Sequence, residues 1–127
     1  MKIGIIGSMH YSEKMLEVGK KLEALCHQVV YSVFINNFIG KDDEEKEKIK
    51  LEQKYHLDAI WEFWNEMQDV DAILAVNFDR KGIKNYIGGN TFLEIGFAYV
   101  LNKKIFSYNP IPDIHFYDTE IKAMKPI

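Results

Sequence analysis

The sequence predicts a single α/β domain over residues 1–127, because strand-like and helix-like segments alternate along the chain. Short, continuous apolar segments of the kind that form buried parallel strands occur at residues 2–6, 28–34, 71–77 and 104–108. Segments with apolar residues at helical spacing lie between them. Such alternation gives right-handed crossovers. We therefore expect a flavodoxin- or Rossmann-like, three-layer open parallel sheet of four to five strands, with helices on both faces.

The first half of the chain begins with the strand at residues 2–6. The helix that follows starts at Ser12, which we expect to be its N-cap. Residues 28–34 are predicted to form the second strand. The charged segment 41–50 is typical of a solvated helix or a mobile loop, and it merges with a helix that continues to Met67.

The second half places the third strand at residues 71–77 and a loop from Phe78 to Gly89. An apolar helix follows, and then the strand at residues 104–108. A turn at residues 109–113 precedes a short helix over residues 118–124, and the last two residues fit the start of a fifth strand.

The composition of the chain argues against a nucleic-acid partner, a membrane partner and a cysteine-based metal cluster. The net charge is −3 and the pI is about 5.8, so the chain lacks the electrostatic footprint of a nucleic-acid-binding protein. No apolar run approaches the length of a membrane span, and no signal peptide is visible, so we expect a cytoplasmic protein without a membrane partner. The single cysteine, Cys26, excludes an internal disulfide and a cysteine-based metal cluster, and its apolar neighbours indicate a buried thiol.

In open parallel sheets, ligands bind beyond the carboxyl ends of the strands. After the first strand, that edge contains Gly7, Ser8 and His10, where a helix N-terminus and hydroxyl groups favour a phosphate. The loop lacks both the dinucleotide fingerprint and the P-loop ending, so it fits an ordinary turn equally well, with His10 at the surface or in a cap. Asn77 ends the third strand at the same edge.

Glu94 is the one charge in the apolar helix over residues 91–101. A buried carboxylate costs several kcal/mol unless something compensates for it. Gly88 and Gly89 precede the helix and let the backbone approach a ligand closely, while Asn90 or Thr91 is expected to cap it. Thr91 and Glu94 also have the spacing of a capping box, which would explain the glutamate without any catalysis. In the functional alternative, a protonated Glu94 is a general acid, and an ionised one attacks the anomeric carbon of a sugar.

Several of these segments together resemble the nucleoside 2-deoxyribosyltransferase-like family, which includes the deoxynucleoside 5′-monophosphate N-glycosidases. The resemblance covers nearly the whole chain, and its specific part is Glu94-Ile95-Gly96-x-Ala98 with the turn before it. It implies that Glu94 is the nucleophile and that Asn90 and Thr91 lie near the nucleotide. It also implies that Gly7, Ser8 and His10 lie by the sugar or its 5′-phosphate. The spacing of Gly88, Gly89, Thr91 and Glu94 is also similar to a motif of nucleoside-monophosphate phosphoribohydrolases, which cleave the same kind of bond.

The sequence therefore leads to two hypotheses. In the first, the protein cleaves or transfers the N-glycosidic bond of a (deoxy)nucleoside or its 5′-monophosphate, without a metal or redox cofactor. In the second, it is a non-catalytic nucleotide- or nucleotide-sugar-binding module on the same fold, because Gly88 stands where the family often has an aspartate. Family sites are commonly completed across a homodimer. The helix with Trp61, Phe63 and Trp64 is more apolar than one core face needs, and it is either that interface or simple core.

Overall fold

The computed structural model describes residues 1–127 and contains one four-stranded sheet in which every pairing is parallel. The order is β2-β1-β3-β4, which is the flavodoxin-like order. The predicted three-layer α/β fold is thereby confirmed, with four strands. Their bounds are Lys2–Gly7 for β1, Gln28–Val30 for β2, Ala72–Val76 for β3 and Lys104–Ser107 for β4.

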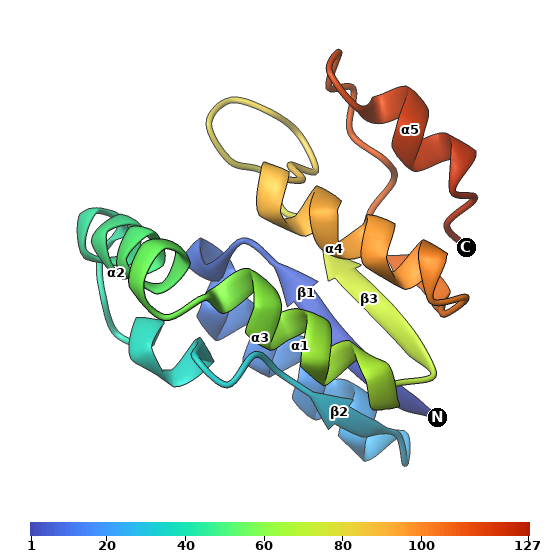
Figure 1. Ribbon diagram of the computed structural model, residues 1–127, viewed down its shortest axis with the longest axis horizontal. Helices are drawn as coiled ribbons and strands as arrows, with labels where there is room; N and C mark the ends of the chain where they lie inside the picture. The colour runs from blue at the N-terminus through green and yellow to red at the C-terminus, as the bar shows by residue number, and fades with distance from the viewer.

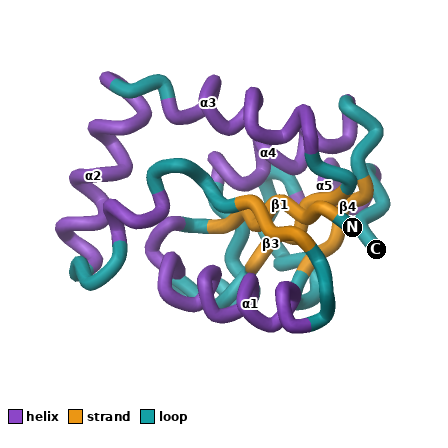
Figure 2. Tube along the Cα trace, turned by 90° about the horizontal axis from the view of Figure 1, so that it is seen from below, coloured by secondary structure: helices purple, strands orange, loops and turns teal.

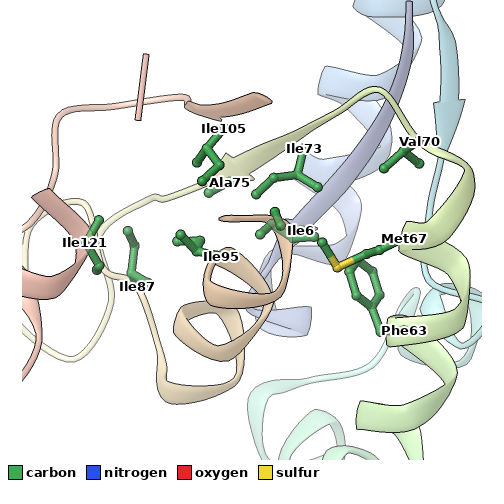
Figure 3. Packing of buried hydrophobic residues seen from close by; sticks show 11 residues of the cluster. Ile6, Phe63, Met67, Val70, Ile73, Ala75, Ile87, Ile95, Ile105 and Ile121 are labelled. Carbon is green, nitrogen blue, oxygen red and sulfur yellow. The ribbon is translucent and has the colours of Figure 1, made fainter. Parts of the chain in front are cut away.

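The sheet buries apolar side chains on both faces. Ile5 and Ile6 of β1 belong to different hydrophobic clusters because successive side chains of a strand point to opposite faces. One cluster lies under α1, and the larger one lies under the helices of the other face (Figure 2). Figure 3 shows how Met67 and Ile95 converge on Ile6 in the larger cluster.

Four α-helices and three short 3₁₀ turns connect the strands, and a fifth α-helix follows the last strand (Figure 1). The helices are α1 (Ser12–Ala24), α2 (Asp43–His56), α3 (Ala59–Glu66), α4 (Gly89–Val100) and α5 (Asp118–Ala123). The turns are η1 (Met9–Tyr11), η2 (Ile35–Phe38) and η3 (Met67–Asp69). The α2 helix lies beyond the carboxyl ends of the strands in both views (Figures 1 and 2).

Two expectations about the first half of the chain are wrong. Ser12 is the buried first residue of α1 and not its cap, while the Ser8 hydroxyl accepts the His10 N–H at 3.3 Å and caps η1 instead. The second strand ends at Val30 and not at residue 34. The predicted second half of the strand does not pair in the sheet, because the backbone N–H groups of Val33 and Phe34 donate to side chains instead. The Glu66 carboxylate accepts the Val33 N–H at 3.1 Å, and the Ser32 hydroxyl accepts the Phe34 N–H at 3.2 Å.

The charged segment forms the start of α2, and it is neither fully solvated nor continuous with the next helix. Lys46 is only 5% exposed and donates hydrogen bonds to Glu13 at 2.7 Å and to the His10 carbonyl at 3.2 Å. Asp58 separates α2 from α3 because its φ of 51° is left-handed, and an α-helix cannot continue through that conformation. The expected merged helix is therefore two helices.

Cys26 is exposed, contrary to the expectation of a buried thiol. It ends α1 in the left-handed conformation with φ 68°. The His27 N–H returns to the Leu22 carbonyl at 3.1 Å and the Cys26 N–H to Glu23 at 2.9 Å, which is the Schellman pattern. At the other end of the chain, Ile127 belongs to no strand, although its N–H donates to the Ile105 carbonyl of β4 at 2.7 Å.

Candidate functional site

The turn before α4 does not form the capping box that the sequence allows. The helix begins at Gly89, and its N-cap is Gly88, which has no side chain that could accept a hydrogen bond from the first turn. Asn90 and Thr91 are therefore inside the helix and not at its cap. Because no side chain caps the helix, the N–H groups of its first turn keep their capacity to bind an anion.

The Glu94 side chain is buried within α4, and the residue is 5% exposed. Its one hydrogen bond comes from the side-chain amide of Asn90, one turn earlier, at 3.1 Å. No cation lies within ion-pair distance of it. The carboxyl group therefore accepts no hydrogen bond from the backbone N–H groups of its own helix.

Burial is the main influence on the acidity of this group. Desolvation, helped by the nearby Glu66 carboxylate, raises the pKa of Glu94 to about 8, and the Lys54 ammonium opposes the rise. The pKa of Lys54 is itself lowered by burial and by the neighbouring Lys50. At neutral pH most Glu94 carboxyl groups hold a proton.

Glu94 opens onto a small cavity, named here the glutamate cavity. Several elements meet around it. The α4 helix supplies Asn90 and Glu94, and α2 supplies Lys50, Gln53 and Lys54. The loop and turn after β2 supply Phe34 and Phe38. Phe63 of α3 completes the aromatic wall. The cavity thus combines one carboxyl group, two side-chain amides and two lysine ammonium groups with aromatic surface.

A second cavity adjoins the first, and the two share Met9, Lys50, Lys54 and Asn90. We name it the basic cavity because four cationic side chains line it and no carboxylate does; they are Lys50, Lys54, Arg80 and Lys81. Its floor is the first turn of α4. A cationic rim over helix N–H groups is an arrangement that binds phosphate.

The structure brings six of the nine predicted site residues to the basic cavity. These are Gly7, Ser8, Gly88, Gly89, Asn90 and Thr91. Glu94 lines the glutamate cavity beside them. Gly7 also has a structural reason to be glycine, because a Cβ there would lie 2.8 Å from the Val76 carbonyl oxygen.

His10 and Asn77 are not brought to either cavity. The ring of His10 lies between two carboxylates of α2, Asp43 at 2.9 Å and Glu47 at 3.0 Å. Asn77 is fully buried, and its amide joins two loops. Its Oδ1 accepts the Asn109 N–H at 2.8 Å, and its Nδ2 donates to the carbonyls of Asn109 at 3.0 Å and Asn85 at 3.4 Å. Both side chains are therefore committed to contacts within the protein.

The site predicted from the sequence lacks the contribution of α2 and of the loop after β3. Lys46, Lys50 and Lys54 follow each other at intervals of four residues, which places them on one face of a helix. That spacing was a usable signal, but the high charge of the segment suggested a solvated surface. Arg80 and Lys81 carried no local signal because only the folded loop brings them to the cavity.

The largest hollow of the molecule, about 570 Å³, lies elsewhere, where β4 begins. Carboxylate side chains are absent from its lining, which includes Val100, Lys104 and Met124. No three His, Cys, Asp or Glu side chains are arranged to hold a metal ion. None of the helices has the length and hydropathy required to span a bilayer.

Comparisons with protein-family models, curated proteins and solved structures give no match for this chain.

Proposed function

We propose that the protein cleaves the N-glycosidic bond of a (deoxy)nucleoside 5′-monophosphate with Glu94 as the nucleophile, as the resemblance to the deoxyribosyltransferase-like family implies. One observation carries the proposal. The Glu94 carboxyl is buried and unpaired with any cation, does not cap its helix, and opens onto a cavity that adjoins a cationic one. Keeping a carboxyl group in this state costs several kcal/mol, and chemistry at the site accounts for that cost.

In the proposed reaction, an oxygen of ionised Glu94 forms a bond to the anomeric carbon of the sugar. The bond from that carbon to the base nitrogen breaks, and its electron pair leaves with the base, which takes a proton from water. The product is an ester between the sugar and Glu94. Water then releases the sugar, or a second base accepts it, and the carboxylate is restored. The hydrogen bond from Asn90 holds the attacking group in one orientation.

The balance of charge in the basic cavity supports a phosphate as part of the substrate. Lys50 is paired with Glu47 at 2.8 Å, and Arg80 is paired with Asp43 at 3.2 Å. Lys54 and Lys81 have no carboxylate within ion-pair distance. Two uncompensated positive charges match the charge of about −2 on a phosphate monoester at neutral pH.

Nucleophilic attack requires the ionised form of Glu94. Because burial raises the pKa of this group to about 8, the rate of base release should rise with pH up to that region. A general acid would give the opposite trend, since its active form is the protonated one. The direction of the pH–rate profile therefore separates the two roles of the carboxyl group.

The direct experiment is incubation of the protein with each deoxynucleoside 5′-monophosphate, with chromatography for the free base. The Glu94→Gln variant should release no base yet bind the nucleotide as the wild type does. Glu17→Gln is the matched control because this glutamate is exposed on α1, and it should retain full activity. If wild type and Glu94→Gln both bind nucleotide and neither releases base, the non-catalytic binding module is the correct function.

We also propose a homodimer formed through α3. Trp61 is 58% exposed and stacks on Trp64 with 6.5 Å between ring centroids, and Trp64 contacts Phe97 of α4 edge-on. Light scattering after size-exclusion chromatography should give the mass of a dimer for the wild type and of a monomer for Trp61→Glu. Phe116→Glu, at an aromatic residue that is 90% exposed elsewhere, should stay dimeric. A monomeric wild type would contradict this proposal.

A further inference from the structure

Gln53 is a buried amide for which the fold provides no partner. Only two residues of α2 are buried, Lys46 and Gln53. Lys46 uses its ammonium group in two hydrogen bonds, whereas the Nε2 atom of Gln53 has no hydrogen-bond partner although the residue is only 5% exposed. An unsatisfied buried donor costs about 1–3 kcal/mol.

The position of the Gln53 amide in the glutamate cavity suggests that it binds a ligand. Gln53 lines the glutamate cavity opposite the residues of α4. The other neutral polar side chains there are already engaged, since Asn90 donates to Glu94 and the Ser32 hydroxyl accepts the Phe34 N–H. The Gln53 amide is thus the neutral polar group of the cavity that has a donor without a partner. Three phenylalanine rings and two lysines are among the other lining residues.

We propose that Gln53 reads the nucleobase and thereby sets the base specificity of the site. Its Nε2 donates to an acceptor on the edge of the base, and its Oε1 accepts from the neighbouring N–H or amino group. The aromatic side chains of the cavity, Phe34, Phe38 and Phe63, provide apolar surface against the flat ring. The inference rests on the proposed function, because it takes the ligand to be a nucleotide.

The chemistry of the side chain predicts a specific change of preference. A carboxamide offers one donor and one acceptor side by side. This pair matches a neighbouring acceptor and donor on the Watson–Crick edge of every base, which in guanine are O6 and N1–H. An ionised carboxylate only accepts. The guanine edge presents two adjacent donors, N1–H and the 2-amino group, and suits a carboxylate best. Gln53→Glu should therefore shift preference toward guanine.

The test is equilibrium dialysis of the full chain with each of the four free bases, which measures recognition without catalysis. Gln53→Met keeps the size and helix propensity of glutamine and should weaken binding of every base that the wild type prefers by about tenfold, the loss of one hydrogen bond to a buried group. Gln53→Glu should lower the ratio of adenine to guanine affinity by about tenfold or more. Gln28→Met changes an exposed glutamine of β2 and should bind as the wild type does.

Circular dichroism and thermal melting establish that each variant is folded before binding is measured. The inference would be overturned if both Gln53 variants bound the four bases with the same affinities, in the same ranking, as the wild type. It would also be overturned if the wild type bound none of the four bases. Base binding that depends on Gln53 without any release of base from nucleotides would refute the proposed catalysis alone. Release of base with unchanged preference in Gln53→Glu would refute the role of Gln53 alone.

Discussion

Asn90 donates its side-chain amide to Glu94 across one turn of α4 at 3.1 Å, and this is the only hydrogen bond that the buried carboxyl group makes. The contact holds the carboxyl on the side of α4 that faces α2 and the glutamate cavity. A capping box would have turned Glu94 back toward the start of its helix. The N-cap of the helix is instead Gly88, three residues before Thr91, so a capping box between Thr91 and Glu94 does not form.

The raised pKa of Glu94 predicts how stability depends on pH. Burial raises the pKa from 4.5 to about 8, so between these values the native state binds a proton that the unfolded state releases. The free energy of unfolding should therefore fall as pH rises from about 5 to 8, by up to about 1.4 kcal/mol per pH unit from this group. Glu94→Gln removes the dependence and should become more stable than the wild type toward pH 8.

Urea denaturation of both proteins at pH 5, 6, 7 and 8 measures this difference. The quantity to plot is the free energy of unfolding of Glu94→Gln minus that of the wild type, because the other titrating groups cancel in it. A difference that rises steadily with pH is the expected result. A difference that stays flat across the window would show that Glu94 is ionised throughout, and the account of its burial would be wrong.

The cationic rim predicts that the 5′-phosphate is recognised separately from the nucleoside. Lys54→Met and Lys81→Met each remove a cation that has no carboxylate partner in the protein. Each should raise the KM for a nucleoside 5′-monophosphate about tenfold, because a hydrogen bond to a charged group contributes about 1.5–3 kcal/mol. Steady-state kinetics with the matching nucleoside should show little change in KM for Lys81→Met.

Lys20→Met is the control for this series because Lys20 is exposed on α1, away from both cavities. It should leave both substrates unaffected. Equal losses for nucleotide and nucleoside in Lys81→Met would mean that the basic cavity does not hold the phosphate.

The α2 helix is held by charge and not by apolar packing, which predicts that it opens locally. No residue of α2 belongs to either hydrophobic cluster. His10 bridges Asp43 and Glu47 through its two ring nitrogens, and only the doubly protonated ring donates to both at once. The cavities under α2 have volumes of about 40 and 80 Å³, below the roughly 300 Å³ of typical ligand pockets. We therefore predict that α2 moves when a nucleotide enters.

Amide hydrogen exchange followed by mass spectrometry measures this opening. Peptides from α2 should exchange faster than those from β1 and β3, because segments with few buried apolar contacts open at low free energy. His10→Ala should accelerate exchange in α2 about tenfold and leave the sheet unchanged. The control is His115→Ala, at an exposed histidine. Protection of α2 equal to that of the central strands would contradict the prediction.

The fold followed from the sequence because its signals are local. The apolar segments at β1, β3 and β4 and the amphipathic pattern of α1 each determine their own element. The errors arose where side chains of distant segments satisfy backbone groups. Glu66 takes the Val33 amide and shortens β2, although the two residues are 33 positions apart in the chain.

Only the part of the candidate site that has a local signal could be predicted from the sequence. Gly88 to Glu94 are consecutive in the chain, so their proximity is visible in the sequence. Gln53 and Lys54 reach the cavity only because His10 and Arg80 hold α2 across the carboxyl end of the sheet. Nothing local in a charged helix distinguishes a residue that faces a cavity from one that faces water.

Trapping of the sugar on Glu94 tests the central claim most directly. A nucleoside 5′-monophosphate with fluorine at the 2′ position slows both steps by destabilising the oxocarbenium-like transition state, and the better its leaving base, the more the covalent intermediate accumulates. Mass spectrometry of the intact protein should show the added mass of one fluorinated sugar phosphate, and peptide mapping should locate it at Glu94. Release of the natural base without any adduct at Glu94, or an adduct on another residue, would contradict the account.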